Sequence, residues 1–149
     1  LGINLASVTA QEVDLDQKVS STDYELLPYD ISKIIVRGFD GSNPPPTMIE
    51  TTRTLLYGYG MTAYHISSDS LIFFRILSLD AVHRDADGNE INRFPIRGSR
   101  YTQDFKDYFL NKIPKDQRKY IWFENIYIKD KKENYLKLAE PQRFCPHCL

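Results

Sequence analysis

The sequence lacks two features that would each assign it to a class of protein. Its 149 residues carry a formal net charge of −1, so there is no excess of positive charge to attract a nucleic acid or an anionic membrane. It also has no uninterrupted apolar run of the roughly 20 residues that a transmembrane helix needs. Its hydrophobic content of 42% and charged content of 26% are typical of one globular domain with a real core. Aromatic residues make up 13% of the chain, which suits β-structure and also a surface that binds a protein partner.

The N-terminal segment has the pattern of an exported protein. Val8 and Ala10 stand at positions −3 and −1 of a cleavage site before Gln11, so we expect residues 1–10 to be the remnant of a secretory signal peptide. No cysteine lies at this site, and we expect no lipid anchor. The polar, acid-rich segment 11–30 predicts a flexible lead-in. A periplasmic or secreted location follows from this pattern.

The clearest structural signals lie in the last third of the chain. Thr102 is the predicted N-cap of a helix over Tyr101–Ile113, whose apolar residues fall on one face. Strands are predicted at Tyr120–Ile128 and Tyr135–Leu138. In the first of these strands the apolar phase slips at Glu124-Asn125. This slip predicts a β-bulge that keeps four residues on the buried side: Ile121, Phe123, Ile126 and Ile128.

The middle of the chain is dominated by strand patterns. The predicted strands are Ser32–Arg37, Met61–Ile66, Leu71–His83 and Ile91–Ile96, and the last two are joined by a hairpin at Asp87-Gly88. The proline-rich stretch Gly38–Pro46 predicts a loop, and Ser67–Asp69 a turn. Thr47–Tyr57 fits a short helix by periodicity, although its threonines also suit a strand.

These elements predict a single domain over residues 31–144. Its fold class is α+β, predominantly antiparallel β and sandwich-like, with one or two short helices. Leu71–His83 carries apolar residues on both faces, so we expect a central strand that is covered on both sides. The expected core comprises Phe73, Leu77, Phe109, Trp122, Phe123 and Ile126.

The tail 145–149 carries the sharpest chemical motif, Cys145-Pro-His147-Cys148. A thiol oxidase with this spacing needs its first cysteine at a helix N-terminus, but only Leu149 follows Cys148. A zinc site would have three ligands in Cys145, His147 and Cys148, and it would need a fourth from His65, His83 or a second chain. The interpretation we favour is a local disulfide or two free thiols in an oxidising compartment.

Other polar clusters have simpler explanations. Residues 85–90 read DADGNE, like the start of a calcium loop, but the glycine is out of place and a hairpin turn explains them better. His65, His83 and Asp80 lie on predicted strands with no nucleophile that can be placed beside them. A small basic cluster is offset by Asp130 and Glu133, which is typical of a solvated turn; its lysines are Lys129, Lys131 and Lys132. We predict no catalytic residue, cofactor or resident metal.

The stretch from Gly60 to Phe144 resembles the C-terminal periplasmic domain of the gliding-motility protein GldM and its relative PorM of Bacteroidetes. The resemblance lies in Phe74–Val82, Arg100–Ile113, Ile121–Ile126 and Tyr135–Leu138. It covers somewhat over half of the chain. The family's turn before the last strand usually holds a glycine, and Lys131-Lys132-Glu133-Asn134 stand in its place here.

The resemblance implies a structural part of the type IX secretion and gliding machinery, with no catalytic residues to carry over. We therefore predict an exported, non-enzymatic protein-interaction or structural domain whose partners are proteins of the cell envelope. The alternative is a thiol-disulfide redox or zinc-binding protein that acts through Cys145–Cys148.

Overall fold

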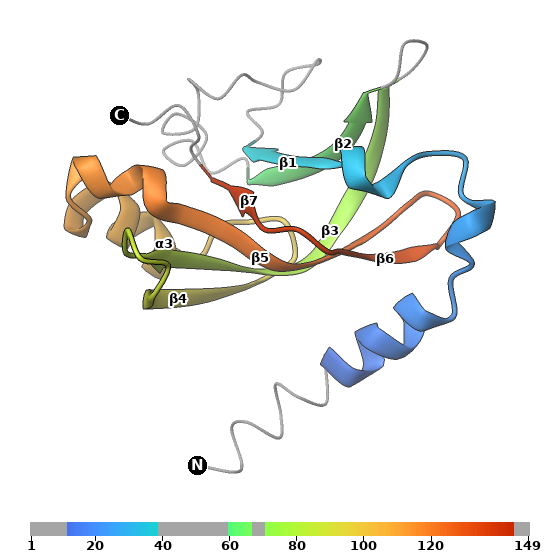
Figure 1. Cartoon of the computed structure of the whole chain (residues 1–149), viewed down its shortest axis with the longest axis horizontal. Coiled ribbons are helices and arrows are strands. Elements are labelled where there is room, and N and C mark those ends of the chain that lie inside the picture. Colours follow the sequence, from blue (N-terminus) through green and yellow to red (C-terminus); the bar gives the residue numbers. More distant parts are fainter. Residues whose placement is uncertain (1–11, 39–59, 67–70, 145–149) are drawn as a thin grey trace.

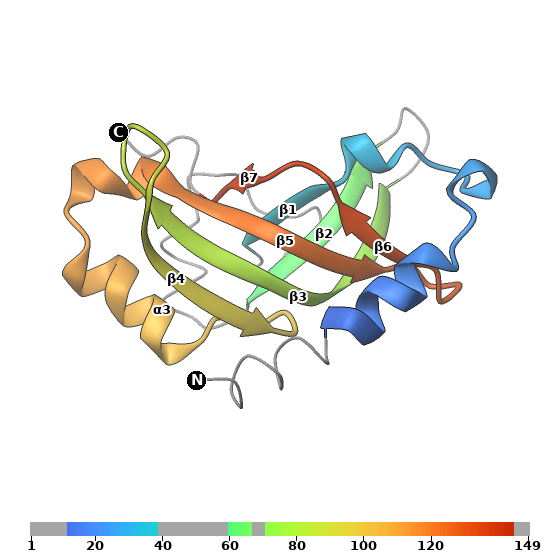
Figure 2. The ribbon, with the colours of Figure 1, turned by 60° about the horizontal axis from the view of Figure 1, so that its bottom comes forward.

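The computed structural model of the chain describes residues 12–38, 60–66 and 71–144. Within these ranges, seven strands form one antiparallel sheet, with short helical segments packed against it (Figures 1 and 2). The predicted α+β fold with predominantly antiparallel β-structure is confirmed. The strands are β1 (Ile35–Gly38), β2 (Met61–Ile66), β3 (Leu71–Arg84), β4 (Glu90–Arg97), β5 (Ile121–Lys129), β6 (Tyr135–Leu138) and β7 (Gln142–Arg143).

The first segment of the described chain contains a helix that contacts the sheet. Residues 12–20 form a helix, and two short turns follow, η1 (Tyr24–Leu26) and η2 (Ile31–Lys33). The helix packs on β5, where the hydroxyl of Tyr127 donates to the carboxylate of Asp16 over 2.5 Å. Tyr127 is only 1% exposed beneath it. The prediction of a flexible lead-in over 11–30 did not include this helix, because polar composition alone does not reveal contacts made with a distant strand.

Strand β3 organises the sheet because it is long enough to pair with three others. The strand order is β1-β2-β3-β5-β6, with β4 also on β3 and β7 also on β5. One edge of β3 pairs with β5, and the other pairs first with β2 and then with β4. We call the point where the pairing of β3 passes from β2 to β4 the fork. There the amide of Gly98 donates to the carbonyl of Leu77 over 2.8 Å, and the amide of Met61 donates to the carbonyl of Ser99 over 2.7 Å. The first bond holds the end of β4 on β3, and the second joins the start of β2 to the segment that follows β4.

Gly60 lies at the tightest point of this fork. Its φ is +84°, and a Cβ at this position would lie 2.3 Å from the carbonyl oxygen of Ser99. Both observations require glycine, because a side chain there would be strained and would collide with backbone.

The β3–β5 ladder contains two bulges, one in each strand. Each bulge reverses which residues of its strand, odd-numbered or even-numbered, face the core. Ile76 pairs with Ile128, Ser78 with Tyr127, and Asp80 with Glu124, so β3 gains one residue first and β5 gains one next. The predicted bulge at Glu124-Asn125 is confirmed, and Asn125 takes a φ of 53° there. The register is restored beyond the second bulge. The four residues expected on the buried side of β5 are all 0% exposed.

The phase reversal explains which core predictions were right. Phe109, Phe123 and Ile126 are fully buried, as predicted. Three others of the expected core are only half-buried, namely Phe73, Leu77 and Trp122. On β3 the core face is instead formed by Phe74 and Ile76 and then, after the bulge, by Leu79 and Ala81. An alternation extended without a bulge selects the wrong residues in one half of the strand.

The helical region after β4 is shorter and less regular than predicted. Helix α3 (Gln103–Asp107) begins at Thr102, whose hydroxyl accepts from the amide of Phe105 over 3.2 Å, so the predicted N-cap is confirmed. The chain then continues as a π-helical turn, η4 (Tyr108–Lys112), and a 3₁₀ segment, η5 (Lys115–Tyr120). The buried face predicted for the helix packs beneath the sheet, where Phe105 and Phe109 contact Phe144.

Some boundaries differ from the predictions, and some predicted elements cannot be compared. The first strand begins at Ile35 rather than Ser32, because Ile31–Lys33 forms a turn capped by Asp30. The predicted loop over Gly38–Pro46 lies outside the described residues beyond Gly38. Thr47–Tyr57 and Ser67–Asp69 also lie outside them.

Candidate interaction surface

The predicted cysteine site cannot be placed, because Cys145, His147 and Cys148 lie outside the described residues. Their proposed fourth ligands are described. Both are buried: His65 is 6% exposed and His83 is 4% exposed. In the described part of the chain, no three His, Cys, Asp or Glu side chains are grouped so that they could hold a metal ion.

His83 and Asp80 lie on opposite faces of β3 and do not form one site. The ring of His83 faces the helical layer, where Nδ1 lies 2.6 Å from the hydroxyl of Tyr108 and Nε2 lies 3.4 Å from Oε1 of Gln117. Burial raises the pKa of Tyr108, so its hydroxyl stays protonated at neutral pH. Asp80 points to the other face and pairs with an arginine. The structure therefore separates two residues that sequence analysis considered together.

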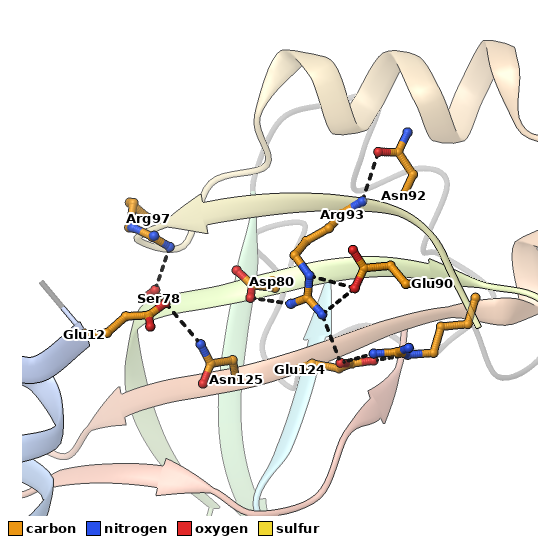
Figure 3. A network of polar contacts seen from close by, with 10 residues as sticks. Glu12, Ser78, Asp80, Glu90, Asn92, Arg93, Arg97, Glu124 and Asn125 are labelled. Carbon is orange, nitrogen blue, oxygen red and sulfur yellow. Dashed lines mark hydrogen bonds and ion pairs between the residues drawn. The ribbon is translucent and has the colours of Figure 1, made fainter. Parts of the chain in front are cut away.

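The face of the sheet that carries Asp80 holds a connected network of charges (Figure 3). Arg93 on β4 lies between three carboxylates, at 2.6 Å from Asp80, 2.8 Å from Glu90 and 3.6 Å from Glu124. Arg84 on β3 binds both oxygens of Glu124, with distances of 2.6 and 2.7 Å. The side chain of Glu124 is 16% exposed and that of Asp80 is 11% exposed.

The network stabilises the ionised forms of three of its members, Arg84, Glu90 and Arg93. The hydrogen bond to Glu90 raises the pKa of Arg93, and the bond to Glu124 raises the pKa of Arg84. The bond from Arg93 lowers the pKa of Glu90. The ion pairs of Asp80 and Glu124 join three strands, β3, β4 and β5.

Two acidic turns close the hairpins as the sequence predicts. Asp85 accepts from the amides of Asp87 and Asn89, at 2.9 and 2.8 Å, and this accounts for the calcium-like pattern as a hairpin turn. Asp130 accepts from the amides of Lys132 and Asn134, both at 2.9 Å. The residue with positive φ in this second turn is Glu133, at 65°. Lys129 of the basic cluster pairs with Glu133 at 2.9 Å, as expected of a solvated turn.

The outer edges of β4 and β6 are occupied by side chains. On β4, the ladder register turns the backbone of Arg93, Pro95 and Arg97 away from β3. Pro95 has no N–H, and the amide of Arg93 donates to Oδ1 of Asn92 over 2.9 Å. On β6, the hydroxyl of Thr22 donates to the carbonyl of Tyr135 over 2.9 Å, and the amide of Lys137 donates to the hydroxyl of Tyr24 over 3.2 Å. Both edges are thus protected against pairing with another strand.

The outer edge of β1 meets β7, and one carboxamide joins them. The amide of Val36 donates to Oε1 of Gln142 over 2.8 Å, and Nε2 of Gln142 donates to the carbonyl of Ile34 over 2.9 Å. Gln142 lies on β7, which pairs with β5, so this contact closes the bent sheet on itself (Figure 1). We call this junction between β1 and β7, defined by Ile34, Val36 and Gln142, the seam.

Two adjoining cavities follow the seam. One has a volume of about 390 Å³ and the other about 200 Å³, and they share four lining residues: Ser32, Ile34, Glu140 and Gln142. The larger cavity is also lined by Arg37 and Arg143. Arg37 donates to the carbonyl of Val36 over 2.9 Å and has no carboxylate partner among the described residues. Burial lowers its pKa, but an arginine remains charged at neutral pH.

Sequence analysis did not identify the seam or the charged network. Gln142 lies four residues after the last predicted strand, and nothing in its local pattern indicates that it reaches β1. The network could have been found in part, because Arg84, Asp80 and Glu124 all lie on or beside predicted strands. Their pairing depends on a register that includes two bulges.

The comparisons with known proteins give no match to this chain: no family model, no curated protein and no solved structure matches it. Among the described residues, the structure has no helix that is both long and apolar enough to cross a membrane.

Proposed function

We propose that this chain is an exported, non-enzymatic protein-interaction domain of the cell envelope. The observation that carries the proposal is the seam, where two adjoining cavities follow a strand edge that side chains cover. Exposed sheet edges are recurring binding sites for extended protein segments, and the edge of β1 would become exposed if the covering side chains withdrew. The N-terminal signal pattern supports export, and the resemblance to the C-terminal domain of GldM and PorM supports a role linked to gliding motility or type IX secretion.

The state of the acidic and histidine side chains supports binding over catalysis. Asp80 and Glu124 are engaged by arginines, and His83 is engaged by Tyr108 on the opposite face. A general acid or base has to contact its substrate, and here these side chains instead contact Arg84, Arg93 and Tyr108.

Site-specific cross-linking in an envelope fraction of the source cells tests the proposal. A photoreactive residue placed at Arg143, which is exposed beside the seam, should give discrete protein adducts. The same residue at Lys115, which is exposed on η5, is the matched control and should give few. Adducts at neither position, or recovery of the chain only from the cytoplasm, would contradict the proposal.

A further inference from the structure

At the seam, a side chain makes the hydrogen bonds to β1 that the backbone of a neighbouring strand would otherwise make. The carboxamide of Gln142 donates to the carbonyl of Ile34 and accepts from the amide of Val36. In a parallel ladder, one residue of the neighbouring strand makes this same pair of bonds to the residues before and after its partner. The carboxamide thus takes the place of a single residue opposite Ile35, on a strand parallel to β1.

A second side chain occupies the next group along the same edge. Arg37 donates through Nη1 to the carbonyl of Val36, which is the acceptor that follows in such a ladder. Two side chains therefore cover three consecutive backbone groups of β1. Side chains can withdraw from these groups without unfolding the strand, because β1 remains paired with β2 on its other edge.

The charges beside the seam indicate what could replace these side chains. The larger cavity is lined by Arg37 and Arg143, against one acid, Glu140. If an incoming strand took the carbonyl of Val36, the guanidinium of Arg37 would be released beside it and would gain a carboxylate there. Arg143, whose guanidinium carbon lies 5.2 Å from the ring centroid of Trp122, is exposed at the other side of the cavity.

We propose that the edge of β1 is the docking site for an extended acidic segment of a protein partner, which adds to β1 as a parallel strand and displaces the carboxamide of Gln142. This inference rests on the proposed function and specifies its binding mode. The backbone pairing supplies affinity, and Arg37 selects acidic side chains.

Model peptides test the binding mode on the isolated chain by nuclear magnetic resonance. The probe is the acetylated, amidated peptide TEVEVEVT, with TKVKVKVT as the charge-reversed control and TEVPVEVT as a control whose central proline lacks the N–H. At concentrations up to about 1 mM, the weak end of specific binding, TEVEVEVT should shift the amides of Ile34–Arg37. Equal shifts with TKVKVKVT or TEVPVEVT, or no shift with any of the three, would overturn the proposal.

Strand direction is tested by a nitroxide label on the N-terminus of TEVEVEVT. In a parallel arrangement the label lies near the start of β1 and should broaden the amide of Ser32. In an antiparallel arrangement it lies near Gly38 and should broaden Met61, which pairs with Gly38 on β2. Broadening of Met61 with Ser32 unaffected would contradict the proposed direction.

Two variants test the roles of the side chains. Gln142→Ala removes the internal competitor and should tighten binding of TEVEVEVT by about five- to tenfold, while lowering the melting temperature. Arg37→Gln should weaken that binding by about tenfold and leave the response to TKVKVKVT unchanged. Unchanged affinity in both variants would mean that the seam is only structural. If Gln142→Ala does not fold, Arg37→Gln and the label experiment on the unaltered chain still test whether the peptide adds to β1 as a parallel strand.

The remaining outcomes separate this inference from the proposed function. Adducts at Arg143 that persist in Gln142→Ala and Arg37→Gln at unchanged yield would leave the interaction domain standing and refute strand addition at β1. A dimer of the chain in sedimentation experiments that competes with TEVEVEVT would identify a second copy as the occupant, and would overturn the acidic-segment proposal. The absence of adducts, together with peptide binding as expected, would contradict only the envelope role.

Discussion

The hydroxyl of Tyr29 donates a 2.7 Å hydrogen bond to Asp130, which lies 101 residues further along the chain. Asp130 is 8% exposed and already accepts bonds from the turn that joins β5 to β6. The contact therefore ties the N-terminal segment to the hairpin that it covers. Burial and the contact with Asp130 both raise the pKa of Tyr29, which keeps its hydroxyl protonated as a donor.

We expect Asp130 to make the stability of the fold depend on pH. Burial raises the pKa of Asp130, but the hydrogen bonds from Asn134, Tyr29 and the turn backbone outweigh it, and the net pKa is lowered. A carboxyl whose pKa is lower in the folded state adds stability above its unfolded pKa, about 3.9, and loses it as the pH falls through the folded pKa. Asp130→Asn should therefore destabilise the chain at pH 7 and differ less from the parent as the pH approaches about 2.

Urea unfolding between neutral and acidic pH measures this effect. Asp116→Asn, at an exposed position on η5, is the matched control and should follow the parent at every pH. A constant difference between Asp130→Asn and the parent across the range would show that the carboxylate's charge is not what stabilises the turn.

We expect the charged network to contribute more to the free energy of unfolding than an ordinary surface ion pair does. Glu124→Gln keeps the shape of the side chain but removes the charge that Arg84 and Arg93 share. Because the pair is only partly exposed, we expect a loss of about 1–3 kcal/mol, between the values for surface and buried pairs. The measurement is urea unfolding at low and high salt. Glu133→Gln, whose side chain is 65% exposed, should change stability little, and an equal effect of the two substitutions would refute the role of burial.

A pair of glycine variants isolates the close approach at the fork. Gly60 and Gly88 have similar φ values, +84° and +88°, but only Gly60 has backbone within reach of a Cβ. Gly88→Ala should therefore cost about 1–2 kcal/mol for the left-handed backbone alone. Gly60→Ala should cost more, because the Cβ would lie 2.3 Å from the carbonyl oxygen of Ser99. Equal melting temperatures for the two variants would mean that the fork relaxes without cost.

We expect Phe109 to be among the most sensitive core positions. Its side chain is 0% exposed and packs edge-on against Phe144, with ring centroids 4.9 Å apart. Phe109→Ala should lower the free energy of unfolding by about 3–5 kcal/mol, the usual cost of removing a buried phenylalanine. Leu26→Ala, at a position that is 79% exposed, is the control and should be nearly neutral. The readout is chemical denaturation followed by circular dichroism.

The parts of the fold that local chemistry determines could be predicted from the sequence. Strand β2 has its predicted bounds, Thr102 caps its helix, and the slip at Glu124-Asn125 is a bulge. Each of these depends on residues within a few positions of one another. The bulge was visible because the apolar phase changes within one strand.

The parts that depend on distant contacts could not be predicted. Leu77 is half-buried because of a bulge between Ile76 and Ser78, where apolar residues on both faces of β3 obscure the change of phase. The helix over residues 12–20 is joined to β5 by a contact between Asp16 and Tyr127. The seam is the extreme case, because the groups that Gln142 bonds lie 106 and 108 residues away. Local patterns carry no information about which strand edge a glutamine will meet.

The two bulges couple the permitted lengths of β3 and β5. Deletion of Asn125 alone would leave the extra residue in β3 without its counterpart, and every pair from Asp80–Glu124 onward would move by one position. Deletion of Leu77 and Asn125 together would restore the pairs on both sides and keep each side chain on its present face, at the loss of the carbonyl that accepts from Gly98. Length changes in these strands should therefore be tolerated only in pairs, so a related sequence that is shorter by one residue in β3 is expected to be shorter by one in β5.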